Sequence, residues 1–294
     1  MSATTSPASK PVNKKGWLTR LRQRNVLPGF GLSMGITVFS LSLLVGLPFA
    51  MMAYTTTQMG WTGFLETITQ PQVTAAIKLS LWMAFLAMLT NMVFGTLVAW
   101  VLVRYEFWGK SLINALVDLP FALPTAVTGI SLATLYAPNG LIGQWFAKFD
   151  IQVAFTPLGI WLALVVVSFP FIVRAVQPVL AELSVEFEEA AAVLGANRFT
   201  TFRKVILPEL LPALLMGAGM MFARATGEYG SVIFIAGNIP MQSEILPLII
   251  ISKLEQFDVQ GASAVALFML LISFVILLTI NIVQWKLSRR VGAR

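Results

Sequence analysis

The sequence contains no cysteine and no histidine, and only 11% of its 294 residues are charged. The first two absences exclude disulfides, zinc sites built from thiolate or imidazole ligands, thiol chemistry and histidine acid–base catalysis. The scarcity of charge argues against a soluble domain, in which about 25% of residues are charged. With 57% hydrophobic residues, the chain is expected to have a lipid bilayer as its solvent.

Six apolar runs are long enough to cross the hydrocarbon core of a bilayer, which takes about 20 helical residues. Because hydrocarbon offers no water to the backbone, each run is expected to be an α-helix, and the sequence lacks the short alternating segments of a membrane barrel. The sequence therefore predicts an all-α, polytopic membrane helix bundle with six transmembrane helices, the first of them retained rather than cleaved as a signal. The predicted spans are Gly29–Tyr54, Leu79–Val103, Leu112–Tyr136, Leu158–Val176, Leu210–Ala236 and Ala262–Trp285.

Lysine and arginine are distributed unequally between the two sides of this bundle. Sixteen lie on the side that holds both termini, with Arg174 counted in the polar gap after the fourth span, and only Lys78, Lys148 and Lys253 lie on the other side. Positive residues concentrate in cytoplasmic loops, so both termini are expected in the cytoplasm. The net charge of +7 then reflects topology and requires no nucleic-acid partner.

The predicted organisation has three parts. Residues 1–27 form a cytoplasmic basic tail, residues 28–290 form the transmembrane domain, and residues 291–294 form a cytoplasmic C-terminus. Within the transmembrane domain, a long polar loop at 181–209 joins the fourth and fifth spans on the cytoplasmic side.

The loop at 181–209 has helical periodicity. Ser184 is placed to cap a helix start, and Gly195 permits the left-handed turn that ends such a helix. A second short helix is expected next, and Pro208 is expected to begin the fifth span. The first helix is acidic, which disfavours contact with anionic lipid. Docking to a protein partner and a structural surface loop remain the two interpretations of this segment.

The spacing within this loop resembles the EAA signature of permease subunits of bacterial ATP-binding-cassette (ABC) importers. Valine stands at one position where the family pattern prefers isoleucine. The resemblance implies a type I ABC-importer permease fold in which this loop is a coupling helix that docks in a cleft of an ATPase subunit. The matching residues are Glu189, Ala190, Ala191, Gly195, Val205, Leu207 and Pro208.

Longer stretches resemble the sulfate/thiosulfate permeases, among them "VLPGFGLS" and "GEYGSVIFIAGNIP", and the resemblance extends from about Val26 to Arg290. It implies a subunit that translocates sulfate or thiosulfate across the bacterial inner membrane, with no cofactor, metal or catalytic residue of its own. The implied partners are two ATPase subunits that hydrolyse ATP, a second related permease, a periplasmic sulfate/thiosulfate-binding protein and membrane lipid. Molybdate and tungstate permeases share the loop signature and are the alternative.

Three ionisable residues lie inside the predicted spans, where a charge is expected to face protein or water. Arg224 and Glu228 are four residues apart, so they are expected to share a helix face and to pair. Counted from Leu210, they lie roughly 21 to 27 Å along the fifth span, past the bilayer midplane. A structural ion pair remains open, and so does a pathway role in which Arg224 attracts a dianion and Glu228 orients it.

The third charge, Asp118, precedes Pro120 and Pro124, which are both expected to kink the third span. An acid is a poor ligand for sulfate, so Asp118 is expected to hold a helix end or to pair with a neighbouring subunit. Two further functional classes are a six-span membrane enzyme and a stand-alone ion-coupled carrier. The enzyme is disfavoured because Asp118 and Glu228 lack paired-acid spacing, and the carrier would transport when expressed alone.

Overall fold

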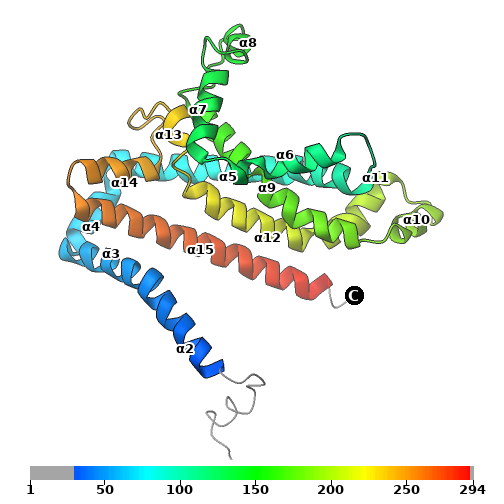
Figure 1. Ribbon diagram of the computed structural model, residues 1–294, viewed down its shortest axis with the longest axis horizontal. Helices are drawn as coiled ribbons and strands as arrows, with labels where there is room; N and C mark the ends of the chain where they lie inside the picture. Colours follow the sequence, from blue (N-terminus) through cyan, green and yellow to red (C-terminus); the bar gives the residue numbers. More distant parts are fainter. Residues whose placement is uncertain (1–29, 292–294) are drawn as a thin grey trace, which may run out of the picture. The chain divides into compact units, whose positions relative to one another are not determined.

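The computed structural model describes residues 30–291 of the chain. The predicted basic tail at 1–27 and residues 292–294 of the predicted C-terminus lie outside the described residues. Every regular element of the described part is a helix, which confirms the all-α prediction (Figure 1). The helices are α2 (Phe30–Leu41), η1 (Ser42–Gly46), α3 (Leu47–Gln58), α4 (Gly60–Thr69), α5 (Pro71–Arg104), α6 (Lys110–Ala122), α7 (Thr125–Tyr136), α8 (Gly143–Ala147), α9 (Pro157–Glu182), α10 (Glu186–Val193), α11 (Arg198–Thr201), η2 (Phe202–Ile206), α12 (Leu207–Thr226), α13 (Val232–Ile235), α14 (Leu246–Glu255) and α15 (Val259–Val291).

The chain divides into two compact units, residues 1–51 and 52–294. In the first unit, α2 continues through the π-helix η1 into α3, which runs on to Gln58 in the second unit. All later elements belong to the second unit. The polar loop and the three intramembrane charges therefore lie in one compact body.

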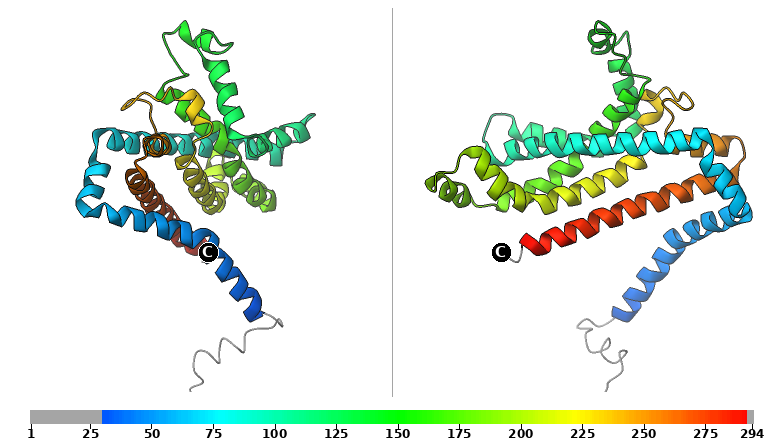
Figure 2. Two further views of the ribbon diagram at one scale, coloured as in Figure 1. Left: turned by 60° about the vertical axis from the view of Figure 1, so that its left-hand side comes forward. Right: turned by 180° about the vertical axis from the view of Figure 1, so that it is seen from behind.

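Four long helices form the centre of the second unit. Helix α9 packs against both α5 and α12, and α12 packs against α15 (Figures 1 and 2). Small residues permit these contacts: a Cβ atom on Gly95 of α5 would lie 2.9 Å from Ile172 Cγ2, and one on Gly217 of α12 would lie 2.8 Å from Ala175 Cβ. In a bilayer, where lipid competes for apolar contacts, such close approach is a main source of helix association.

Five helical stretches in the described range are long and apolar enough to cross a membrane, and a sixth span results if the bent pair α6–α7 is counted as one. The six-span prediction is therefore consistent with the structure. The continuous stretches are Phe30–Gln58, Pro71–Arg104, Pro157–Glu182, Arg198–Thr226 and Val259–Lys286.

The third predicted span is broken rather than kinked. The chain bends by 109° between helices α6 and α7. The break falls at Leu123 and Pro124, where ψ is 138° and 131°. Proline disfavours the helical conformation in the residue before it and has no amide hydrogen to donate. Pro120, by contrast, lies inside α6 and does not end the helix.

The predicted bounds of the fourth and fifth spans also need correction. Helix α9 continues to Glu182. Arg174 was counted with the polar gap although the predicted span reached Val176, and it lies inside the span, two turns from its end. The expected second loop helix is not separate, because α11, η2 and α12 form one continuous helical stretch from Arg198 to Thr226. That stretch ends ten residues before the predicted end at Ala236. The rest of the predicted span contains only the short helix α13.

Candidate coupling loop and anion pathway

Helix α10 carries the first half of the signature and lies at the end of the second unit opposite α14 (Figure 1). The Oγ atom of Ser184 accepts a hydrogen bond of 3.2 Å from the amide of Glu186, but the N-cap position belongs to Val185, one residue later than predicted. Glu186, Glu188 and Glu189 all lie in the first turn. Their negative charges favour this helix start, where the helix dipole is positive.

The turn after α10 has the predicted geometry. Gly195 has a φ of +80°. The amide of Ala196 donates to the carbonyl of Ala191 and the amide of Gly195 donates to that of Ala192, both at 2.9 Å. This pair of bonds is the Schellman motif, which leaves the position of Gly195 in a conformation that strains other residues.

The next helical stretch begins with a cap that the sequence analysis did not identify. The Oδ1 atom of Asn197 accepts a hydrogen bond of 2.8 Å from the amide of Thr200. Val205, Leu207 and Pro208 then lie within η2 and the first turn of α12, all partly buried. The second half of the signature is thus built into the base of a spanning helix.

Large apolar side chains of α10 and α11 are exposed. Val193 and Leu194, at the end of α10, are 88% and 87% exposed, and Phe199 on α11 is 71% exposed. Large apolar side chains exposed in a polar loop are typical of a protein-binding surface. This favours the docking interpretation of the loop over a plain surface connection.

Two residues of α5 hold the loop, and neither was singled out from the sequence. Arg104 Nη2 donates to Glu188 Oε1 at 2.8 Å and to the carbonyl of Leu183 at 3.1 Å. One turn earlier, the ring of Trp100 meets Phe202 of η2 edge-on at 6.2 Å. The basic residue in the last turn of α5 was the available signal, but its partner lies 84 residues away in sequence.

The bent pair is attached to α9 by a polar network around Arg174. Its guanidinium donates to both oxygens of Asp118, at 2.7 and 2.5 Å. It also donates to the side chain and the carbonyl of Asn114 and to Gln177 Oε1, at 3.0, 2.9 and 2.6 Å. The five donors of this arginine are therefore all used. Asp118 has its partner within the chain, in place of the expected helix end or neighbouring subunit.

Arg224 and Glu228 form an ion pair, as predicted. The helix ends at Thr226, however, so the pair forms across the C-terminus of α12 rather than on one helix face. Glu228 is 1% exposed, and its Oε1 atom accepts hydrogen bonds from the amide and the hydroxyl of Ser231, at 3.0 and 2.9 Å. The side chain of Arg224 is 38% exposed.

The segment after α12 is seated on α7. A Cβ atom on Gly230 would lie 2.2 Å from Thr125 Oγ1, and one on Gly129 of α7 would lie 2.3 Å from the carbonyl oxygen of Ser231. At Gly129 the neighbouring atom belongs to the backbone, so only glycine allows this approach. The break at Pro124 thus places the first turn of α7 directly against the segment that holds Glu228.

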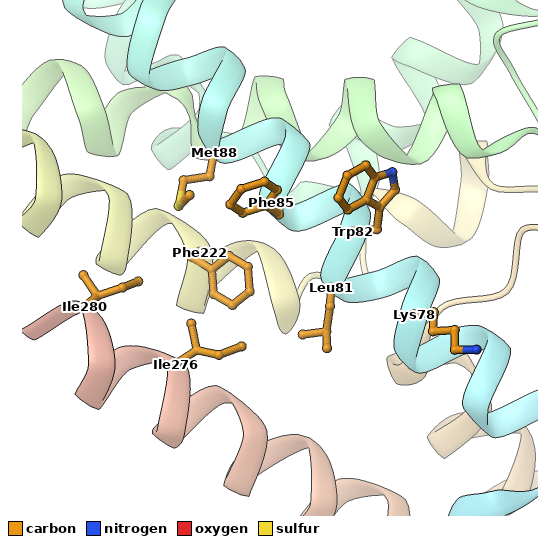
Figure 3. Close-up of a pocket in the computed structure, with 8 residues that line it drawn as sticks. All are labelled: Lys78, Leu81, Trp82, Phe85, Met88, Phe222, Ile276 and Ile280. Atoms are coloured by element: carbon orange, nitrogen blue, oxygen red, sulfur yellow. The ribbon is translucent and has the colours of Figure 1, made fainter. Parts of the chain in front are cut away.

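An apolar pocket of about 680 Å³ opens between α5, α12 and α15 (Figure 3). Trp82, Phe85 and Phe222 are among its lining side chains, and Lys78 lies at one end. The other lining side chains are apolar or aromatic, so besides the Lys78 cation these side chains offer a dianion only the indole N–H of Trp82. Its chemistry fits a hydrocarbon chain better than sulfate.

Comparisons with known proteins agree with this architecture. Residues 91–293 match the family described as binding-protein-dependent transport system inner membrane component. The sulfate transport system permease protein CysT of Escherichia coli K12 is 51% identical over 91% of this chain and 97% of that protein. The protein of the same name from Synechocystis is 47% identical over 85% of this chain and 87% of its own length.

Solved structures give the same fold at low identity. A subunit of a bacterial ABC transporter that imports the polysaccharide alginate superposes with a TM-score of 0.71 at 16% identity, over 92% of this chain and 98% of that chain. A chain of a methionine ABC transporter in inward-facing conformations gives 0.54 at 19% identity, over 74% of this chain and 99% of that chain. With the matched residues and the CysT relatives, the protein belongs to the inner membrane components of binding-protein-dependent transport systems, in the group of the sulfate transport permeases.

Proposed function

We propose that the protein is the transmembrane permease subunit of an ABC importer and translocates sulfate and thiosulfate with ATP hydrolysed by partner subunits. The sulfate transport permeases to which it is similar support the substrate class. The structural observation that supports coupling to an ATPase is helix α10, which is exposed and ends in the Schellman motif at Gly195. The membrane is the bacterial inner membrane, and both termini and the loop at 181–209 face the cytoplasm.

In this function α10 is the coupling helix. Glu189, Ala190 and Ala191 lie on it, and the small alanine side chains let its backbone approach a cleft of the ATPase closely. Arg104 and Trp100 join the two halves of the loop to α5. A displacement of α10 by the ATPase is thereby passed to α5 and, through the continuous helix, to α12.

The full transporter contains two ATPase subunits, a second related permease and a periplasmic sulfate/thiosulfate-binding protein. The binding protein delivers the anion at the end of the bundle where α14 lies. Membrane lipid covers the apolar outer faces of the spans, and an acyl chain fits the pocket beside Phe85 and Phe222.

Substitution of Gly195 tests the coupling role. Leucine at a φ of +80° costs about 1–2 kcal/mol of local strain, so Gly195→Leu is expected to disturb the end of α10 and to loosen ATPase docking. Gly60→Leu is the matched control, since Gly60 has a φ of +73° and equally open surroundings but begins α4, far from α10 in the sequence. The measurements are copurification of the ATPase and ATP hydrolysis stimulated by the loaded binding protein.

We expect Gly195→Leu to reduce both quantities while the control retains them. Normal copurification and stimulation in Gly195→Leu would contradict the coupling role. Competition of labelled sulfate uptake by thiosulfate, molybdate and tungstate tests the substrate. Displacement by molybdate or tungstate at much lower concentration than by thiosulfate would favour the alternative substrate class.

A further inference from the structure

The Arg224–Glu228 pair lies at the depth of the bilayer core. A Cβ atom on Gly227, next to the pair in sequence, would lie 4.0 Å from Met269 Cε. Met269 is about 15 Å along α15 from Val259 and about 25 Å from Lys286 at the other end of the span. A charged group at this level costs several kcal/mol toward lipid, so it must face protein or water.

The two members of the pair differ in how their hydrogen-bonding capacity is used. Glu228 is buried, and its two oxygens are occupied by Arg224 and by Ser231. Arg224 uses Nη1 for the ion pair and has no other hydrogen bond or ion pair within residues 30–291. Its side chain is 38% exposed, so the Nε and Nη2 hydrogens are left for a ligand. The acid is satisfied by the protein, and the arginine is not.

Arg174 provides the internal comparison. It also lies in a span beside a carboxylate, but Asp118, Asn114 and Gln177 take all of its donors. A passing anion would find no free N–H group there. Among the described arginines inside spans, Arg224 alone combines bilayer depth, exposure and unused donors.

The chemistry of these donors fits a tetrahedral dianion. A guanidinium presents parallel N–H groups that match two oxygens of sulfate or thiosulfate. Glu228 nearly neutralises the site, so the remaining attraction is directional rather than strong. A transport pathway needs this balance, because an anion held by an unpaired buried cation would leave slowly.

We propose that Arg224 is the anion-contacting residue of the translocation pathway and that Glu228 and Ser231 are positioning residues which fix its guanidinium. The proposal rests on the proposed function as a sulfate and thiosulfate permease. It resolves the choice between a structural pair and a pathway pair in favour of the pathway. The glycine contacts with α7 then serve to hold the segment that carries Glu228.

The test compares two charge-removed pairs in the complete transporter, reconstituted with its ATPase subunits, second permease and binding protein. Arg224→Met with Glu228→Gln removes the proposed contact, and Arg174→Met with Asp118→Asn is the matched control. Neither double variant leaves a buried charge alone, so both are expected to assemble. Sulfate uptake is normalised to assembled complex.

We expect the uptake of the Arg224/Glu228 variant to fall at least about tenfold, because the loss of one charge-assisted hydrogen bond to the anion corresponds to that factor. The control is expected to retain most of its uptake. Uptake near the wild-type rate in the Arg224/Glu228 variant would overturn the proposal. If that variant does not assemble, Arg224→Lys decides, because lysine keeps the charge but loses the planar fork. A raised KM for sulfate then supports the contact, and an unchanged KM overturns it.

Two further readouts separate this proposal from the proposed function. Ser231→Ala removes one bond to Glu228 without changing charge, so it is expected to raise the KM for sulfate several-fold and to leave kcat nearly constant; an unchanged KM would argue against the positioning role. ATP hydrolysis stimulated by the loaded binding protein is expected to persist in all variants. Its absence in the wild-type complex would contradict the proposed function itself, whatever the variants do.

Discussion

The two ion pairs inside the spans, Arg174–Asp118 and Arg224–Glu228, differ in which member has all of its hydrogen-bonding groups occupied. In the Arg174–Asp118 pair the arginine is saturated with acceptors and the acid is 49% exposed, whereas in the Arg224–Glu228 pair the acid is saturated and the arginine is the exposed member. The saturated partner belongs to the scaffold in each case. The difference teaches that a charge in a membrane span is best interpreted from its unused donors and acceptors, because the presence of a counter-charge alone does not distinguish the two pairs.

The largest effect on stability is expected at Arg174. Arg174→Met removes the four hydrogen bonds that join α9 to α6 and leaves Asp118 without a partner. Loss of one member of a buried ion pair costs about 3–5 kcal/mol, and partial exposure of this pair places the loss at the lower end. The yield of folded protein after detergent extraction measures the effect. A yield equal to that of the wild type would contradict the scaffold role of this pair.

Removal of the acid from the second pair is expected to have a smaller effect. Glu228→Gln keeps an acceptor for Ser231 but leaves Arg224 without its counter-charge, and the exposed arginine retains some hydration. The loss in thermal stability is therefore expected to be less than that of Arg174→Met, measured under the same detergent conditions. A larger loss would mean that Arg224 is packed against protein or lipid instead of facing water.

Arg104 extends the comparison to the loop, outside the bilayer core. Arg104→Gln removes the contact with Glu188, and a partly exposed pair of this kind contributes about 1 kcal/mol or less. We expect nearly normal stability but weaker stimulation of ATP hydrolysis, because α10 is no longer joined to α5. Lys110→Gln is the control, since the Lys110–Glu106 pair has the same charges and an exposed acid but no link to the loop. Equal stimulation in both variants would contradict the coupling path through α5.

The smallest effect is expected at the opposite end of the bundle. A hydrogen bond from Lys253 lowers the pKa of Asp258 below its ordinary value of 3.8, with a smaller contribution from the amide of Gly261. Because the folded pKa is the lower one, this stabilisation is complete above pH 3.8 and is lost as the pH falls through the folded value. The melting temperature of the wild type should therefore fall slightly more than that of Asp258→Asn below pH 3.8. Parallel curves would show that the pair adds no stability.

The sequence was sufficient for the fold class and the turn at Gly195, and its six-span count is consistent with the structure. Long apolar runs and a glycine at a helix end carry local information, and local information determines these features. The pairing of Arg224 with Glu228 was also predictable, since four residues of spacing brings the two groups together even where the helix ends between them.

The contacts between distant helices could not be predicted in the same way. Arg174 pairs with a residue 56 positions away, and Arg104 with one 84 positions away. The only available signals were local: Asn114 and Asp118 four residues apart, and Arg174 and Gln177 three residues apart, in otherwise apolar surroundings. Those spacings show that the polar groups share a helix face, but not which helices face each other.

ATP-dependent accumulation of labelled sulfate in proteoliposomes tests the central claim most directly. The account predicts accumulation when this chain is reconstituted with the second permease, the ATPase subunits and the loaded binding protein, and none when the chain is reconstituted alone. Accumulation by the chain alone, driven by an ion gradient, would contradict the account and would favour a stand-alone carrier.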